Sequence, residues 1–175
     1  MSFFAVPTKE FDTNLFHMIG DEWLLICCYD EANNKTNLMT ASWGGMGILW
    51  NKEVCFLFVR PQRYTHDLLE KQNRFSVCVL PEEYRKAHKV CGSQSGRNVD
   101  KVAVTGLHEA EFNGVKAVAE SKFVLVVKQL YRDDLIKTGF LEETLLKNYP
   151  TDDFHTVYVC EIEKIFQKKD LNCTF

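Results

Sequence analysis

The fold of this chain is decided by residues 23–43, which read Trp23-Leu24-Leu25-Ile26-Cys27-Cys28-Tyr29, then Asp30-Glu31-Ala32-Asn33-Asn34-Lys35, then Thr36 and Asn37-Leu38-Met39-Thr40-Ala41-Ser42-Trp43. The first run is short and apolar, and the polar segment after it is typical of a turn. The third run then returns as a partner strand, closed by Gly44 and Gly45. Residues 23–43 therefore predict an antiparallel hairpin.

Further apolar runs predict more strands, at residues 54–59, 75–80, 122–131 and 155–166. The first of these ends at Arg60-Pro61, because proline cannot donate a hydrogen bond to a ladder. Helices are expected at residues 64–71, after Pro81, and at residues 141–147. Strands outnumber helices, and their separations are too irregular for repeated strand–helix–strand units. We therefore expect a mainly β (α+β) fold, an antiparallel barrel with a few peripheral helices.

Composition limits the class of protein. The chain has 175 residues, 46% of them apolar, which suits a single domain over residues 1–175. Lys and Arg number 21 against 24 Asp and Glu, so the net charge of −3 argues against a nucleic-acid partner. No apolar run reaches the roughly 18 residues of a membrane span, and the N-terminus does not resemble a signal peptide. Seven cysteines without a Cys-x-x-Cys pair suggest buried thiols in the cytoplasm.

Three polar segments with glycines interrupt the apolar framework, and each offers ligands for an anion. In the first, residues 37–45, two hydroxyls and an amide alternate with small residues beside the Trp43 indole. Small residues let a planar ligand approach the backbone, whose N–H and C=O groups can bind its edge. The alternative is a plain strand with Thr40 and Ser42 facing outward. This segment alone leaves both interpretations open.

The second segment, residues 60–65, begins with two arginines and ends with a hydroxyl. Arg60 and Arg63 precede Thr65, which stands at the start of a predicted helix. Backbone N–H groups at a helix start and the bidentate donors of arginine both favour a phosphate. A solvated turn with Thr65 as the helix cap is the alternative.

The third segment, residues 92–101, combines glycines with the charges of Arg97 and Lys101. Its glycines permit convergent backbone N–H groups, although an ordinary surface loop fits as well. It is not a Walker A loop, because no Gly-Lys-Ser/Thr follows at the required distance. The single His-x-x-Cys pair, His88 and Cys91, argues against zinc, and no nucleophile elbow is present. Any chemistry would therefore come from a cofactor.

Taken together and in order, the three segments resemble the flavin reductase-like family, FMN-binding split-barrel proteins that include the flavoredoxins. The resemblance is carried by residues 37–45, 60–65 and 95–101, followed by Thr105-Gly106-Leu107, and runs from about Trp23 to Ile165. It implies an antiparallel Greek-key split barrel that forms a homodimer and holds FMN near the subunit interface. The family loop usually has Asp where this chain has Asn98, which alters a loop ion pair without abolishing the site.

The resemblance also implies which residues bind the flavin. By position these are Asn37, Thr40, Ala41, Ser42, Trp43, Arg60, Tyr64, Thr65, Gly96, Arg97, Lys101 and His155. Thr65, helped by Arg60 and Tyr64, is expected to hold the phosphate. Lys101 matches the family's flavin-contacting lysine, and a cation there would raise the reduction potential, because reduced flavin is anionic around N1. His155 matches a histidine that opens the last strand and faces the cofactor.

The function implied by the resemblance is that of an NAD(P)H-dependent flavin reductase. In such an enzyme a hydride passes from NADH or NADPH to N5 of bound FMN, and electrons pass on to an acceptor, with no catalytic side chain required. One alternative is a flavoredoxin-type electron-transfer protein reduced by a redox protein partner. A non-catalytic flavin-binding module and a barrel that binds another anion are further alternatives, since fold and cofactor do not determine function.

Overall fold

The structure is a computed structural model that describes residues 2–169. Its main sheet consists of eight antiparallel strands: β1 (Phe3–Val6), β2 (Leu24–Asp30), β3 (Lys35–Ala41), β4 (Gly44–Leu49), β5 (Lys52–Val59), β6 (Arg74–Val79), β9 (Phe123–Asp134) and β10 (Thr156–Lys168). They are hydrogen-bonded in the order β3-β2-β6-β9-β10-β5-β4, and β1 pairs with β10. A separate hairpin contains β7 (Glu109–Phe112) and β8 (Val115–Val118).

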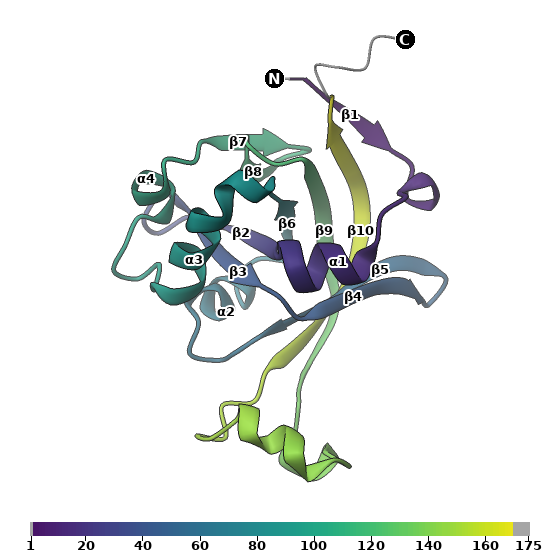
Figure 1. Ribbon diagram of the computed structural model, residues 1–175, viewed down its shortest axis with the longest axis vertical. Coiled ribbons are helices and arrows are strands. Elements are labelled where there is room, and N and C mark those ends of the chain that lie inside the picture. The colour runs from purple at the N-terminus through teal and green to yellow at the C-terminus, as the bar shows by residue number, and fades with distance from the viewer. Residues whose placement is uncertain (1, 170–175) are drawn as a thin grey trace.

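The helices are short and lie around the curved sheet (Figure 1). They are η1 (Thr8–Glu10), α1 (Leu15–His17), the π-helical η2 (Met18–Glu22), α2 (Tyr64–Leu69), η3 (Glu82–Tyr84), α3 (Arg85–Ser93), α4 (Lys101–Thr105), η4 (Lys137–Gly139) and η5 (Glu143–Asn148). No helix among residues 2–169 is long and apolar enough to cross a membrane. The expected mainly β fold with peripheral helices is confirmed.

The sheet curls into a barrel that stays open between β3 and β4, the two ends of the hydrogen-bonded order. The β2–β3 ladder ends at Leu24 and Ala41, and the β4–β5 ladder begins at Gly44 and Leu57. Ser42 and Trp43 therefore cross the opening without a partner in either ladder. This opening makes the fold a split barrel, as expected from the resemblance.

Strand β2 is buried on both faces, which explains why its sequence is apolar throughout rather than alternating. Leu24, Ile26 and Cys28 pack into the core inside the barrel. Leu25 and Cys27 pack into a second core on the other face of the strand. That second core also contains residues of α3, β3, β6, β8 and β9, namely Leu38, Cys78, Ala87, Cys91, Ala117, Val118 and Val124.

Two expectations about the glycine-containing segments were wrong. Gly44 and Gly45 do not close a strand but begin β4, an edge strand that pairs with β5. A Cβ on Gly44 would lie 2.6 Å from the Phe56 carbonyl oxygen, so glycine is required for the two strands to approach. The loop expected at residues 92–98 instead spans residues 94–100, because α3 extends to Ser93 and α4 begins at Lys101. Asp100 caps α4 by accepting a hydrogen bond from the Ala103 N–H.

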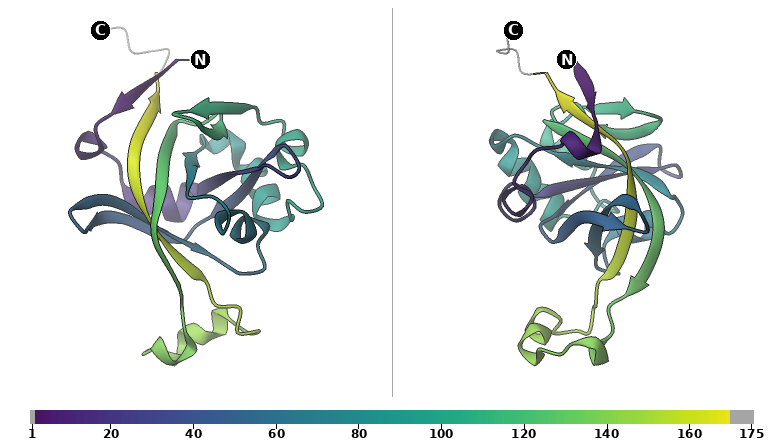
Figure 2. Two further views of the ribbon diagram at one scale, coloured as in Figure 1. Left: turned by 180° about the vertical axis from the view of Figure 1, so that it is seen from behind. Right: turned by 90° about the vertical axis from the view of Figure 1, so that its right-hand side faces the viewer.

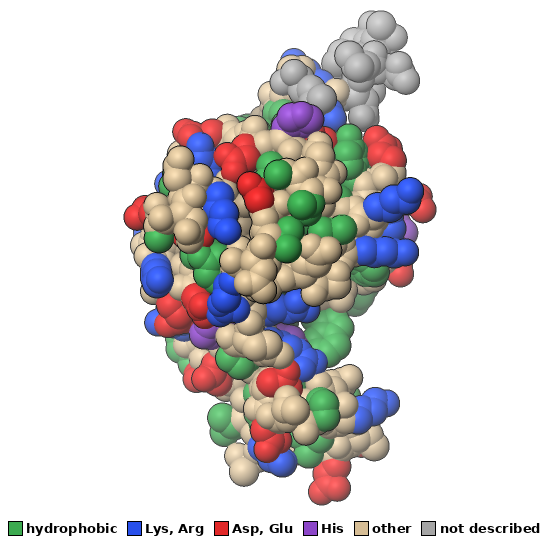
Figure 3. Space-filling view, turned by 90° about the vertical axis from the view of Figure 1, so that its left-hand side faces the viewer, with side chains coloured by type: hydrophobic (Ala, Val, Ile, Leu, Met, Phe, Trp, Pro, Cys, Tyr) green, Lys and Arg blue, Asp and Glu red, His purple; other side chains and the backbone are tan. Residues whose placement is uncertain are grey.

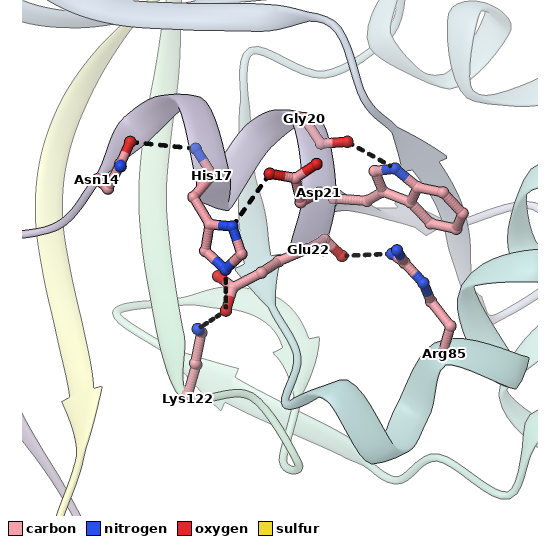
Figure 4. A network of polar contacts seen from close by, with 8 residues as sticks. Asn14, His17, Gly20, Asp21, Glu22, Arg85 and Lys122 are labelled. Carbon is pink, nitrogen blue, oxygen red and sulfur yellow. Dashed lines mark hydrogen bonds and ion pairs between the residues drawn. The ribbon is translucent and has the colours of Figure 1, made fainter.

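A network of polar contacts stabilises the segment directly before β2 (Figure 4). Glu22 accepts from Lys122 at 2.6 Å through its carboxylate and from Arg85 at 3.3 Å through its carbonyl. Trp23 has a φ of 74°, in the left-handed region that favours glycine. Its indole N–H donates to the Gly20 carbonyl at 3.0 Å, and the Arg85 guanidinium lies 3.6 Å from its ring centroid. These contacts hold the strained residue in place.

Strands β9 and β10 continue past the rest of the sheet and carry residues 135–155 away from the body (Figures 1 and 2). Their ladder extends to Asp134 and Thr156. On the described surface that Figure 3 presents, Lys and Arg side chains are interspersed with Asp and Glu. That face therefore offers no continuous basic surface of the kind that binds nucleic acid.

Candidate functional site

Two adjoining pockets lie at the opening of the barrel and share Met39, Arg60 and Arg63. The Trp43 pocket, about 160 Å³, is lined by Met39, Thr40, Ala41, Ser42, Trp43, Phe58, Arg60, Arg63 and His155. The Thr65 pocket, about 470 Å³, is lined by Met39, Arg60, Gln62, Arg63, Tyr64, Thr65, Ser93, Gln94, Ser95, Gly96 and Lys101. Together they form one groove with an aromatic end and a cationic end.

The Trp43 pocket presents aromatic side chains and unpaired backbone. The Trp43 and His155 ring centroids are 5.1 Å apart, and Phe58 lies edge-on to His155 at 6.5 Å. Burial, and secondly the charge of Arg60, lowers the pKa of His155 to about 4, so the imidazole is neutral at pH 7. Ser42 belongs to neither ladder, so its N–H and C=O can pair with the edge of a planar ligand.

The Thr65 pocket has a polar floor built from two buried side chains. The Asn37 amide donates to the Thr65 hydroxyl at 2.8 Å, which leaves the threonine proton available for another acceptor. The Asn37 Oδ1 atom is buried without a partner in the described part of the chain. A Cβ on Gly96 would lie only 1.9 Å from that oxygen, so only glycine fits at this position.

Two cations at the Thr65 pocket have no carboxylate partner among residues 2–169. Arg63 donates to the Gly92 carbonyl at 2.6 Å, and burial, followed by the charge of Arg60, lowers its pKa. Lys101 donates to the Leu38 and Cys91 carbonyls at 2.7 and 2.9 Å. Burial lowers the pKa of Lys101 to about 8. Because both charges are compensated only by neutral carbonyl oxygens, the pocket favours an anion.

Arg60 differs from these two cations in having a carboxylate partner, although, like Arg63, it lines both pockets. Its guanidinium forms an ion pair with Asp153, donates to the Asn148 carbonyl at 2.7 Å, and lies 5.2 Å from the Tyr149 ring centroid. Its charge is therefore neutralised by the segment that precedes β10. Arg60 ties that segment to the groove and is less available to a ligand than Arg63.

Ten of the twelve residues expected to bind a flavin line the groove, and two do not: Asn37 lies beneath it, and Arg97 lies outside. Arg97 pairs with Asp67 at 2.6 Å and donates to the Gln62 carbonyl at 3.1 Å. The Tyr64 hydroxyl donates to the buried Asp30, and that hydrogen bond raises the pKa of Tyr64. Arg97 thus fixes its loop against α2, and Tyr64 fixes α2 against the end of β2.

Some residues of the groove were not singled out by the sequence. Arg63 stood in the second segment, but the resemblance assigned the phosphate to Arg60, Tyr64 and Thr65. Ser93, Gln94 and Ser95 stood in the third segment and line the Thr65 pocket. Phe58 lies in an apolar run, where strand alternation alone separates it from the buried Leu57 and Val59. No group of three or more His, Cys, Asp or Glu side chains in residues 2–169 could hold a metal ion.

Comparisons with known proteins agree with this geometry. Residues 21–173 match the flavin reductase like domain. Similar solved structures include an FMN-binding domain of a flavin reductases-like enzyme from Shewanella baltica, with 16% identity, a TM-score of 0.69, and coverage of 95% of this chain and 77% of that one. The flavoredoxin of Desulfovibrio vulgaris shares 19% identity and a TM-score of 0.68, with coverage of 97% of this chain and 80% of the other.

A third structure, an NADH:FAD oxidoreductase of Streptomyces globisporus, shares 15% identity and a TM-score of 0.62, with coverage of 84% of this chain and 75% of the other. No curated protein matches the chain. Identities this low establish a shared fold and leave the activity open. The match to the domain, in contrast, covers most of the sequence, and the chain therefore belongs to the flavin reductase-like family.

Proposed function

We propose that this chain binds FMN as a single domain over residues 1–175 and acts as an NAD(P)H-dependent flavin reductase. The observation that carries the proposal is the pair of uncompensated cations, Arg63 and Lys101, at one end of a groove whose other end is aromatic. FMN has this polarity, with an apolar ring system at one end and a phosphate at the other.

The residues of the groove fit such a ligand. Arg63 and the Thr65 hydroxyl supply donors for the phosphate, and Gly96 leaves room for close approach. Trp43 and His155 offer an aromatic surface for the ring, and the Ser42 backbone lies where a ring edge would pair. When bound, a flavin supplies two-electron chemistry, accepting a hydride and releasing electrons to an acceptor.

The electron donor is proposed to be NADH or NADPH. Trp43 is 46% exposed, so the Trp43 pocket is open to a second planar molecule. The residues that line the ring end of the groove include no carboxylate, and His155, whose pKa is lowered to about 4, is only a weak base, so no acid–base catalyst there has a pKa near 7. A hydride transfer needs none. We propose the cytoplasm as the location, where thiols stay reduced, in keeping with six free buried cysteines.

The family resemblance implies a homodimer, and we propose that the two copies associate through the projecting segment, residues 135–155 between β9 and β10. Its apolar side chains are exposed: Ile136 at 63%, Leu141 at 101% and Leu145 at 46%. Such a cluster is typical of an interaction surface. Light scattering tests this directly, because Leu141→Lys should lower the measured mass to that of a monomer. A dimer that survives this substitution together with Ile136→Lys would place the interface elsewhere.

The test of the proposed activity begins with the visible spectrum of protein loaded with FMN and freed of excess flavin. NADH and then NADPH are added under anaerobic conditions. We expect two flavin bands that bleach with at least one nicotinamide. Protein that retains no FMN would refute the proposal altogether. Bands that persist with both nicotinamides but bleach with a reduced ferredoxin-like donor would instead make the chain an electron carrier.

A further inference from the structure

A cavity with a volume of about 770 Å³ lies apart from the groove. It is lined by residues of β2, β6, the end of α2 and the β7–β8 hairpin, with Gln129 and Arg132 of β9. Its charged side chains are largely satisfied, since Arg132 pairs with Glu70 at 2.7 Å and Arg74 with Glu163 at 2.8 Å. The reactive group that remains on its wall is the thiol of Cys27.

Cys27 has a second thiol beside it. Its Sγ atom lies 3.6 Å from the Sγ of Cys78, on the neighbouring strand β6. The β2–β6 register pairs Leu25 with Cys78 and Cys27 with Ser76, so the two cysteines are diagonal neighbours on one face. A disulfide requires a separation of about 2.05 Å, so the two sulfurs must approach by roughly 1.5 Å.

The surroundings of Cys78 favour its thiolate. Burial raises the pKa of Cys78, but hydrogen bonds, above all that from the Cys27 thiol, outweigh burial and lower it below its usual value. Burial and the hydrogen bond with Cys78 raise the pKa of Cys27. Cys78 is therefore the thiol of the pair that ionises first, while Cys27 keeps its proton, the arrangement of a nucleophile beside a resolving thiol.

We propose that Cys27 and Cys78 form a peroxide-sensitive dithiol that closes to a disulfide, with hydrogen peroxide entering through the 770 Å³ cavity. The Cys78 thiolate attacks one peroxide oxygen, the O–O bond breaks, and hydroxide leaves, which oxidises the sulfur to a sulfenic acid. The Cys27 sulfur then attacks the Cys78 sulfur. The S–S bond forms, the S–O bond breaks, and the hydroxyl leaves with the Cys27 proton as water. In sum, two thiols lose two hydrogens and one peroxide becomes two waters.

The chain contains its own control pair. Cys55 and Cys160 are directly opposite each other in the β5–β10 ladder and are fully buried inside the barrel. Neither cysteine lines any of the pockets described for residues 2–169. The hydrogen bond with Cys55, followed by burial, raises the pKa of the Cys160 thiol. Proximity alone would oxidise this pair as readily. All four thiols are buried to the same degree, so what distinguishes the first pair is that Cys27 lines the cavity and that hydrogen bonding lowers the pKa of Cys78.

The experiment maps disulfides in the whole protein. Native protein receives one equivalent of hydrogen peroxide, the reaction is stopped with catalase, and free thiols are alkylated in denaturant before digestion and mass spectrometry. We expect the Cys27–Cys78 linkage, with two hydrogens lost, ahead of any Cys55–Cys160 linkage. Because hydrogen bonding lowers the pKa of Cys78, the initial rate of oxidation should be higher at pH 8 than at pH 5.5.

Two results would overturn the proposal. One is oxidation of Cys55–Cys160 at an equal or greater rate, and the other is persistence of both thiols while the lone Cys91 is oxidised. Cys27→Ser provides a further check, because the serine hydroxyl keeps a hydrogen-bond donor beside Cys78 but cannot form a disulfide, so Cys78 should then stop at the sulfenic acid and be trapped by dimedone. The mapping in the unsubstituted protein decides the matter even if that variant does not fold.

Discussion

Replacing Arg63 by glutamine tests the proposed anion site most directly. No carboxylate in the described residues neutralises the Arg63 guanidinium. Its hydrogen bond to the Gly92 carbonyl uses one of the five N–H donors of the guanidinium. The remaining donors are available to the Thr65 pocket, which Arg63 lines. A hydrogen bond to a charged group contributes about 1.5–3 kcal/mol, which corresponds to a loss of about 10- to 150-fold in affinity.

The assay is the dissociation constant of FMN and of riboflavin, measured by quenching of flavin fluorescence. Riboflavin lacks the phosphate, so Arg63→Gln should weaken FMN and leave riboflavin nearly unchanged. A general loss of structure would weaken both. The matched control is Arg97→Gln, since Arg97 is already paired with Asp67 and does not line the pocket.

Equal losses in Arg63→Gln and Arg97→Gln would refute the reasoning. So would an equal loss for FMN and riboflavin in Arg63→Gln alone. The first outcome would mean that pocket position is irrelevant, and the second that Arg63 supports the fold rather than the phosphate.

Three further predictions follow from the same contacts. Gly96→Ala should lower both the melting temperature and the affinity for FMN, because the new Cβ would lie 1.9 Å from Asn37 Oδ1. Gly47→Ala is the control and should change neither, because no atom lies within 4 Å of the Cβ position there. FMN affinity should fall as pH rises through about 8, where Lys101 loses its charge, and Lys101→Gln should remove that dependence when titrated from pH 6.5 to 9.5. The buried His88 has a folded-state pKa lowered to about 4 by burial and then by Arg85, below its unfolded value of about 6.5. The unfolded chain therefore binds a proton first, so up to about 3 kcal/mol of stability, present above pH 6.5, is lost as pH falls toward 4. Urea unfolding at pH 7 and pH 4.5 measures this loss, which should be smaller in His88→Gln; an equal loss in the variant would assign it to other groups.

Much of the barrel could be predicted because local sequence and tertiary packing agree there. The hairpin of β2 and β3 combines two apolar runs with a polar turn, and β5 ends at Val59, shortly before Pro61, which lacks a ladder donor. Strand β4 could not be predicted, because Gly44 is selected by the close approach of β5 and the glycine-rich strand gives no alternating pattern. Short pieces such as α4 depend on a single cap at Asp100, a signal too weak to read alone.

The candidate site was predictable as a set of residues but not in the role of each one. Arg60 and Arg63 look equivalent in the sequence, since both precede Thr65. The difference between them comes from Asp153, which lies 93 residues from Arg60 along the chain and neutralises only that guanidinium. Whether a charge is neutralised by a distant segment depends on the fold, so it could not be predicted from the spacing of residues in the sequence.

The burial of both faces of strand β2 affects how the protein unfolds. Since alternate residues of this one strand belong to two separate cores, neither core can lose its packing without exposing a face of β2. Substitutions on opposite faces, such as at Ile26 and Cys27, should therefore be non-additive in their effect on stability. The barrel interior and the layer beneath α3 are expected to melt in one cooperative transition, although their side chains form distinct clusters.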